Sequence, residues 1–305
     1  MSLPLKNKNS VVRKYKRFVL NGVGGIGKST GVATITKKPL VFDFDGRFPT
    51  ALVDKADFVE VPNNYMDFVK ILHSVLQETS LPYDWIQFDT ATKIMSVVED
   101  WTIAKDCNGS KEKYNAYGHG LKFAPQYFKE ILDIIDAIQA KHGVNVAFIC
   151  HSKVRNFQNP LTEAYTKNVL DLPEIVADKL KQWADYVGYA YFDVEVDKEK
   201  KKAIGDPERM VSFTESPLYE AKNSSDFKLP KSLKFDKVGK WAEVVFGATQ
   251  SYIIELEALV TKFPPDFQVA LKAEIEKANI LGMGIDEIKS FIEAGKEQLK
   301  KVKNA

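Results

Sequence analysis

The sequence has little cysteine, little net charge and no long apolar run, and each shortage excludes a class of protein. The two cysteines, Cys107 and Cys150, lie far apart, which excludes a disulfide framework and a cysteine-rich zinc site. A net charge of +2 means that any nucleic acid must be bound by a local patch of cations. No run of 18 apolar residues and no apolar leader occur, so we expect an intracellular chain without a membrane span.

What the sequence does contain is an alternation of strand and helix patterns. Hydrophobic residues make up 45% of the chain, which is enough for a substantial core. Up to about residue 150, short apolar runs alternate with segments of helical periodicity, which predicts an α/β fold around a mostly parallel sheet. Runs at 186–196 and 209–216 predict an antiparallel extension, and helices near 266–279 and 285–301 predict a small C-terminal appendage.

Changes in these patterns predict three parts of the chain. Residues 1–13 are predicted to be a flexible N-terminal tail, residues 14–247 the α/β domain, and residues 248–305 a C-terminal helical region. Two polar stretches inside the α/β domain, 105–120 and 153–171, are predicted to be loops, because they lack apolar periodicity.

A glycine-rich segment between the first predicted strand and the first predicted helix carries the strongest functional signal. Its eight residues, GVGGIGKS, fit the pattern G-x-x-x-x-G-K-[ST] of a phosphate-binding loop. Glycines let backbone N–H groups turn towards phosphate oxygens, and the following helix N-terminus adds partial positive charge. We therefore predict that ATP is bound here. The binding residues predicted are Gly22, Gly24, Gly25, Ile26, Gly27, Lys28, Ser29 and Thr30.

Two residues of this loop and one distant acid have separate predicted roles. The ammonium group of Lys28 can reach the β and γ phosphates, so we predict a catalytic role as well as a binding role. The hydroxyl of Ser29 can ligate Mg²⁺, a cation that prefers oxygen ligands. Asp89 ends the predicted strand WIQFD and is the second predicted metal ligand, with a turn or helix-capping role as its alternative.

Further polar residues follow predicted strands at the same edge of the sheet. Asp45 follows the second strand and is predicted to orient or deprotonate the attacking water. Asp43 lies one pleat earlier on the same face and competes for this role, while a turn beside Gly46 is the alternative role of Asp45. His151 follows a later apolar strand and is predicted to sense the γ-phosphate, with a structural histidine as the alternative.

Together these residues resemble the RecA-like phage ATPases, a family of phage nucleotide-binding proteins that includes single-strand annealing and recombination ATPases. The likeness covers about residues 15–245. It includes, in this order, VLNGVGGIGKST, VFDFDGR, WIQFDTATKI, AYGHGLKF, VNVAFICHSK and YEAKNSSDFKLP. The resemblance implies a RecA-like P-loop NTPase fold, an ATPase that uses ATP and Mg²⁺, and a homo-oligomer in the cytoplasm of a bacterial host.

The resemblance also assigns roles to residues outside the loop. It places the water-activating acid on Asp45 and the polar residue at the tip of the later strand on His151. Because aspartate is one carbon shorter than the carboxylate typical of the family, hydrolysis is predicted to be slow or stimulated by DNA. Lys222 corresponds to a cation that reaches a neighbouring subunit's nucleotide, although Ser224 stands where relatives often carry arginine.

The segment after His151 corresponds in these relatives to a loop that contacts DNA. Cations together with an aromatic ring suit a single strand, because cations contact phosphates and the ring stacks on a base. A solvated loop of mixed charge is the alternative, which Glu163 and Asp171 favour. The residues predicted to contact single-stranded DNA are Lys153, Arg155, Phe157 and Lys167.

These features support three hypotheses that differ in the partner of the protein. In the first, a phage or prophage ATPase acts on single-stranded DNA in recombination or replication, alongside other phage proteins of those processes. In the second, a P-loop ATPase acts as a loader or accessory switch through protein contacts without binding DNA. In the third, a structural protein binds nucleotide with little turnover. Stimulation of ATP turnover by single strands separates the first hypothesis from the other two.

Replacing Lys28 by alanine tests the phosphate-binding loop. The variant lacks the one cationic side chain of the GVGGIGKS segment, so we expect ATP binding or turnover to be abolished. Titration calorimetry with ATP and Mg²⁺ and a phosphate-release assay measure the two quantities. Unaltered ATP affinity in a Lys28→Ala variant that melts like the unmodified protein would contradict the assignment.

Overall fold

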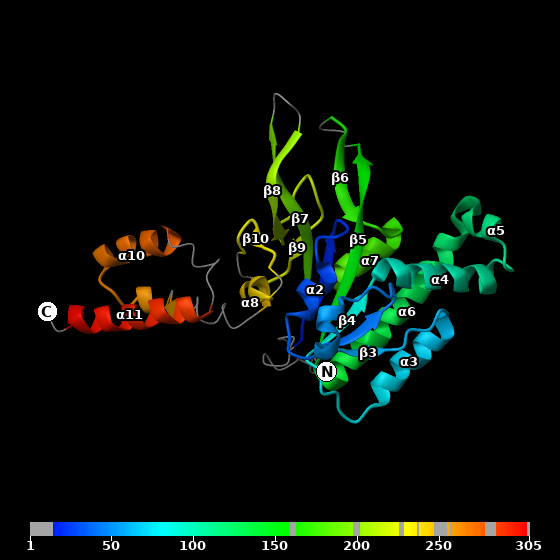
Figure 1. Ribbon diagram of the computed structural model, residues 1–305, viewed down its shortest axis with the longest axis horizontal. Coiled ribbons are helices and arrows are strands. Elements are labelled where there is room, and N and C mark those ends of the chain that lie inside the picture. Colours follow the sequence, from blue (N-terminus) through cyan, green and yellow to red (C-terminus); the bar gives the residue numbers. More distant parts are fainter. Residues whose placement is uncertain are drawn as a thin grey trace, which may run out of the picture.

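A computed structural model describes most of the chain, and Figure 1 shows an α/β body with two hairpins rising from one end of its sheet. The described residues are 15–158, 163–197, 202–225, 229–236, 238–246, 255–256, 258–277 and 285–303. The predicted tail at 1–13 lies outside them, and so does the predicted boundary at 247–248. The division into an α/β domain and a C-terminal helical region therefore stays a prediction.

One sheet of ten strands forms the centre of the described structure, in the order β10-β8-β7-β1-β5-β4-β2-β3, with β6 paired to β5 and β9 to β7. The strands are β1 (Arg17–Gly22), β2 (Leu40–Asp43), β3 (Asp57–Val59), β4 (Trp85–Asp89), β5 (Asn145–Phe157), β6 (Tyr165–Leu170), β7 (Tyr186–Asp197), β8 (Lys202–Ser212), β9 (Lys222–Asn223) and β10 (Leu233–Lys234). Neighbours from β7 to β3 pair in parallel, whereas β6, β8, β9 and β10 pair antiparallel. The predicted parallel sheet and its antiparallel extension are confirmed.

Helices cover both faces of this sheet (Figure 1). They are α2 (Lys28–Ala33), α3 (Tyr65–Gln77), α4 (Ala91–Asp106), α5 (Lys111–Asn115), α6 (His119–His142), α7 (Glu174–Trp183), α8 (Lys240–Phe246), α10 (Pro265–Lys277) and α11 (Ile285–Lys303), with 3₁₀ turns at Thr50–Lys55 and Ala116–Gly118. Strand side chains alternate between two cores: Val19 packs with α3, α4, α6 and α7, whereas Phe18 and Leu20 pack with α2 and α8.

The register of the parallel strands brings the predicted site residues to one edge. Gly22 at the end of β1 lies opposite His151 of β5, and Asp89 at the end of β4 lies opposite both Ile149 of β5 and Asp43 of β2. Strands that run in parallel end at the same side of a sheet, which is where ligands bind in open α/β folds. The candidate site is therefore expected at the C-terminal ends of β1, β5, β4 and β2.

The first predicted loop, at 105–120, is mostly helical, so this prediction is wrong. Residues 105 and 106 end α4, α5 occupies Lys111–Asn115, and α6 begins at His119. The polar residues that suggested a loop include helix caps: the Ser110 hydroxyl accepts a hydrogen bond from the Lys113 backbone N–H. Short helices with exposed polar faces lack the apolar periodicity on which the prediction depended.

The second predicted loop, at 153–171, is largely a β-hairpin, so this prediction is also corrected. The strand predicted to end at residue 150 continues to Phe157, and β6 returns antiparallel with Ser152 opposite Leu170 and Phe157 opposite Tyr165. This part of the hairpin stands outside the helical layers, so polar residues occupy both of its faces and no alternation marks it. These strands are defined by the hydrogen-bonded pairing between β5 and β6 and not by a pattern in the sequence.

Smaller differences lie in the second half of the chain. The strand predicted at 209–216 begins earlier, as β8 at Lys202, and α8 was not predicted at all. The two C-terminal helices are confirmed close to their predicted bounds, as α10 and α11 (Figure 1). Within the described segments, no helix combines the length and the apolar character that crossing a membrane requires.

Tight packing holds α2, the helix after the glycine-rich loop, against the ring of Phe235. A methyl group added to Gly31 of α2 would lie 2.3 Å from Cζ of this ring. The ring is buried and packs on Trp241, with ring centroids 5.4 Å apart, so it has little room to move. Glycine is therefore required at position 31 because the Phe235 ring lies too close for a side chain, and not because the helix needs it.

Replacing Gly31 by alanine tests this contact. Alanine normally stabilises a helix relative to glycine by up to about 1 kcal/mol, but here overpacking should reverse the sign and cost about 1–3 kcal/mol. Urea unfolding measures the change. In a Phe235→Leu background, which gives up the rigid ring, the cost of Gly31→Ala should shrink. Stabilisation by Gly31→Ala in the unmodified chain would contradict the contact.

Candidate functional site

The glycine-rich loop runs from the end of β1 to the start of α2 and leaves open space above it. Gly25 and Gly27 have φ values of 75° and 95°, in the left-handed region that side chains rarely adopt. Methyl groups added to Gly24 or Gly25 would meet no atom within 4 Å, whereas one on Gly22 would lie 2.3 Å from the Ala190 carbonyl oxygen of β7. The loop thus combines close backbone packing below with room for a ligand above.

Ile26 and Thr30, two of the predicted binding residues, lie at the end of the loop and in the first turn of α2. The Ile26 side chain is fully buried in the core around α2, so only its backbone can contact a ligand. Thr30 lies in the first turn of α2, where its carbonyl accepts hydrogen bonds from the backbone and the hydroxyl of Thr34. Both placements suit a loop whose N–H groups, and not its side chains, enclose phosphates.

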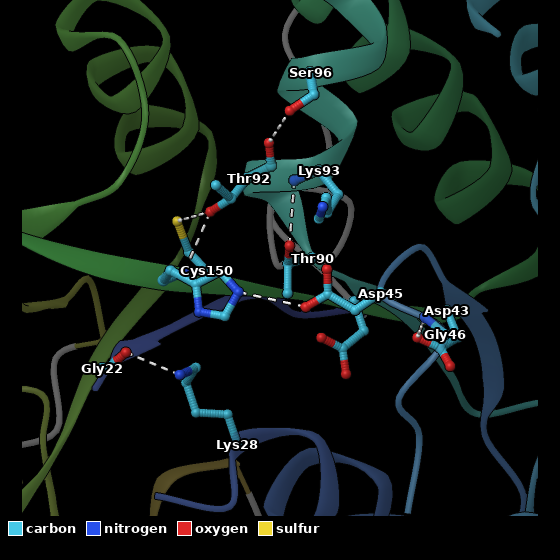
Figure 2. A network of polar contacts seen from close by, with 12 residues as sticks. Gly22, Lys28, Asp43, Asp45, Gly46, Thr90, Thr92, Lys93, Ser96 and Cys150 are labelled. Atoms are coloured by element: carbon cyan, nitrogen blue, oxygen red, sulfur yellow. Dashed lines mark hydrogen bonds and ion pairs between the residues drawn. The ribbon is translucent and has the colours of Figure 1, made fainter. Parts of the chain in front are cut away.

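Lys28 is the cation of the site and is 6% exposed. Its Nζ donates to the carbonyl oxygen of Gly22 at 2.8 Å (Figure 2) and to that of Val23 at 2.9 Å. Burial lowers the pKa of Lys28, and the negative charge of Asp89 opposes that shift. The ammonium group is therefore held over the loop by two carbonyls, which phosphate oxygens can replace.

Asp89 and Ser29 are the predicted metal ligands, and the Ser29 hydroxyl is near enough to the Asp89 carboxyl to affect its pKa. Asp89 is 4% exposed, and burial raises its pKa to about 6, while the nearby Ser29 hydroxyl opposes the rise. The charges of Asp43 and Asp45 raise the pKa of Asp89 further. This buried carboxyl lies among like charges, which a divalent cation would offset.

The donors present fit Mg²⁺ bound together with a nucleotide. Among the described residues, no cluster of three or more histidine, cysteine or acidic side chains could enclose a metal by itself. Mg²⁺ usually takes one or two protein oxygens and completes its shell with phosphates and water. A hydroxyl at Ser29 and a carboxylate at Asp89, beside a phosphate-binding loop, match that requirement.

Asp43 and Asp45, which the sequence left as competitors, are separated by their partners. The Asp43 carboxylate accepts hydrogen bonds from the backbone N–H groups of Gly46, at 2.9 Å, and Phe48, at 3.0 Å. Asp45 Oδ2 instead lies 3.4 Å from Nε2 of His151 (Figure 2). Asp43 thus fills the turn role, and the Asp45 carboxylate remains available at the edge of the sheet.

Two residues of the site were not predicted from the sequence. Gln87 lies two residues before Asp89 on the same face of β4, and its Nε2 is 3.4 Å from Asp89 Oδ2 and 3.5 Å from the Ser29 carbonyl. Thr92 at the start of α4 accepts a hydrogen bond of 3.3 Å from the His151 backbone N–H. A buried amide inside the apolar strand WIQFD was a usable signal for Gln87, whereas nothing in the sequence marked Thr92.

The Lys222 side chain is engaged within its own chain, whereas the resemblance implies a contact with a neighbouring subunit's nucleotide. Its Nζ donates to the carbonyl oxygens of Lys181, at 2.9 Å, and Ala184, at 2.7 Å, at the C-terminal end of α7. A cation suits this position because the last carbonyls of a helix carry partial negative charge. Reaching a neighbouring subunit's nucleotide would require both bonds to break, and that role stays a prediction.

The four residues predicted to contact DNA gather on the β5–β6 hairpin, beyond His151. The cations are paired with acids: Lys153 with Asp171 at 3.2 Å, Arg155 with Glu174 at 2.7 Å, and Lys167 with Glu215. Phe157 stacks on Tyr165, with ring centroids 5.8 Å apart. Arg155 and Lys167 lie 5.7 and 6.0 Å from the Phe157 ring, so the aromatic pair is flanked by two cations.

A comparison with known families now identifies the domain. A family model described as an AAA domain matches residues 14–225, more than half of the chain. The chain belongs to the AAA domain family. This membership, together with the mostly parallel sheet and the loop, confirms the predicted α/β P-loop NTPase fold and indicates a nucleotide-hydrolysing P-loop ATPase.

Solved structures similar to this AAA domain protein are distant. The RadB recombinase is 10% identical with a TM-score of 0.40, over 74% of this chain and 90% of that one. The flagellar accessory protein FlaH from Methanocaldococcus jannaschii is 10% identical with a TM-score of 0.36, over 75% of this chain and 91% of that one. Similarity at this level carries no argument about substrate or partner. No curated protein matches the chain.

Replacing Asp89 by asparagine tests the cost of the buried carboxyl in the nucleotide-free protein. Because its pKa is higher in the folded chain than in the unfolded chain, Asp89 favours folding most below pH 4, and this contribution is lost as the pH rises to about 6. Asp89→Asn removes that dependence. Its stability relative to the unmodified protein should increase between pH 4 and pH 7 by up to about 3 kcal/mol.

Urea unfolding at the two pH values, without nucleotide or Mg²⁺, measures this difference. Asp133→Asn is the matched control, because Asp133 is an exposed acid of α6 paired with Lys129. Its effect on stability should be small at both pH values, since exposed pairs contribute little. An Asp89→Asn effect that is the same at pH 4 and pH 7 would contradict a raised pKa.

Proposed function

We propose that this protein binds ATP with Mg²⁺ at the glycine-rich loop, hydrolyses it slowly, and uses the bound nucleotide to control a single-stranded DNA site on the β5–β6 hairpin. The observation that carries the proposal is the contact between Asp45 and His151, at the base of β5. His151 is continuous in sequence with the hairpin, and the Asp45 backbone N–H donates to the carbonyl of Asp89, the proposed metal ligand. One side-chain contact therefore joins the two functional regions.

In the hydrolytic step, Asp45 orients the attacking water and accepts its proton. The water oxygen forms a bond to the γ-phosphorus, the bond to the bridging oxygen breaks, and ADP leaves with that electron pair. Lys28 would hold the β and γ phosphates, and Ser29 and Asp89 would hold Mg²⁺, which when bound would offset the phosphate charge. The short reach of the Asp45 side chain and its sharing with His151 support slow turnover.

His151 is the proposed sensor of the γ-phosphate. Its side chain is 40% exposed at the strand edge, and its ring nitrogen can exchange Asp45 for a phosphate oxygen. The His151 backbone is held on both sides, because its N–H donates to Thr92 and its carbonyl accepts from the Asp171 N–H. A shift of the ring would therefore act on α4 and on the strand that carries the hairpin.

The chemistry of the hairpin supports a single-stranded nucleic acid as partner. A stacked pair of aromatic rings, Phe157 and Tyr165, can extend onto unpaired bases, which all present a flat face. The flanking cations can exchange Glu174 and Glu215 for backbone phosphates. DNA as substrate, recombination or replication as the process, a phage or prophage origin, a homo-oligomer and a cytoplasmic location all rest on the sequence resemblance.

A second candidate function is a nucleotide-controlled switch that contacts a protein, such as a loader or accessory factor. The ion pairs of the hairpin favour it, because Lys153, Arg155 and Lys167 are each neutralised within the chain. An exposed surface of paired charges suits a complementary protein surface as well as a phosphate backbone. The same ATPase chemistry would then act without DNA.

Measurements with and without oligo(dT) distinguish the two functions. We expect single strands to raise the ATP turnover of the unmodified protein and to bind in a salt-dependent manner. Phe157→Ala removes a stacking ring and should weaken strand binding by about 1–3 kcal/mol, roughly tenfold or more. Fluorescence anisotropy with a labelled oligonucleotide and a phosphate-release assay measure both effects.

Phe267→Ala is the matched control, because Phe267 is an exposed aromatic residue of α10, outside the hairpin. It should leave strand affinity unchanged. If oligo(dT) alters neither turnover nor oligomer size, and Phe157→Ala binds strands like the control, DNA should be abandoned as the partner. Retained ATP hydrolysis in that case would favour the protein switch.

A further inference from the structure

An arginine of the antiparallel extension lies beside the glycine-rich loop, and no part of the site described above uses it. Arg209 belongs to β8, opposite Phe192 of β7. A methyl group added to Gly27 would lie 3.4 Å from Nη1 of Arg209. Gly27 is the last glycine of the loop and directly precedes Lys28, so the guanidinium group reaches the point where the loop becomes helix.

The guanidinium group of Arg209 has no partner within the described residues, where no hydrogen bond, ion pair or ring contact involves it. By contrast, Arg17 pairs with Asp136 and Arg155 pairs with Glu174. A partly buried arginine without an acid carries a full charge that is poorly compensated. Such a charge, aimed at a loop that binds anions, is suited to a ligand that brings its own negative charge.

The backbone of Arg209 is firmly placed. Its carbonyl accepts a hydrogen bond of 2.7 Å from the N–H of Phe235, the residue whose ring covers α2. Two residues further along β8, Val211 is buried in the core that also holds Ile26 of the loop. Alternation along the strand puts Arg209 on the same face as Val211. The side chain is thus directed at the loop by the sheet and by the packing of α2.

We propose that Arg209 contacts the phosphate chain of the bound nucleotide from within the same chain. Its planar fork of N–H donors can bind two phosphate oxygens at once, on the side of the loop that faces β8. Lys28 and Arg209 then hold the triphosphate between them. The contact also joins the β7–β8 extension to the nucleotide, independently of the link from His151 to the β5–β6 hairpin.

Binding measurements on Arg209 variants test this proposal, which relies on the nucleotide site proposed above. We expect Arg209→Gln to weaken the binding of Mg²⁺–ATP and of inorganic triphosphate by about tenfold or more, since charged hydrogen bonds contribute about 1.5–3 kcal/mol. Arg209→Lys keeps the charge but loses the fork, so its affinity should be intermediate. Titration calorimetry and competition against a fluorescent nucleotide give these affinities.

Lys234→Gln is the matched control, because Lys234 lies on the neighbouring strand β10 and its charge is exposed and paired with Glu208. It should bind both ligands like the unmodified protein. A thermal melt checks that each variant is folded, and Arg209→Lys gives the answer should Arg209→Gln not fold.

The outcomes separate failure of this inference from failure of the site itself. Unchanged affinity of folded Arg209→Gln, while Lys28→Ala loses binding, would overturn the role of Arg209 alone. Weakened ATP binding with unchanged binding of inorganic triphosphate would also overturn it, because the contact would then be to the base or sugar. Absence of any triphosphate binding by the unmodified protein would overturn the nucleotide site and the role of Arg209 together.

Discussion

Parallel pairing of β1, β5, β4 and β2 in a single register is the constraint on which the site depends. This register sets the phosphate-binding loop after Gly22 beside His151, and His151 one strand away from Asp89. A shift of one residue in any of these strands would turn its polar end towards the opposite helical layer. The fully buried aromatic core between β4, β5 and the covering helices, with Phe88 stacked on Phe148, makes such a shift costly.

In the nucleotide-free protein, two ionisable side chains of the site are buried at an electrostatic cost. Asp89 is buried among like charges, and Lys28 is buried with its ammonium on backbone carbonyls. A metal–triphosphate complex supplies charge of both signs: phosphates for Lys28 and a cation for Asp89 and Ser29. Part of the binding free energy would therefore come from relief of burial costs already present in the fold.

Two hairpins rise from the end of the sheet at which the loop lies, and a residue at the base of each lies near the candidate site (Figure 1). The β5–β6 hairpin continues from His151, which contacts Asp45. The β7–β8 extension carries Arg209, which lies beside Gly27. A ligand that engages both residues would act on both hairpins, because each residue is anchored in a strand of the central sheet. In the proposed function, bound nucleotide would thereby act on two separate surfaces.

The sequence by itself determined the loop, the alternation of strands and helices, and the acids at strand ends, because glycine spacing and apolar periodicity are local properties. It did not show that the segments at 105–120 and 153–171 are folded, since polar helices and hairpins outside the core carry no apolar pattern. Only the tertiary structure separated Asp43, held in a turn, from Asp45, which faces His151. It alone placed Arg209 beside Gly27, because residues 182 positions apart meet through strand pairing, which no local pattern encodes.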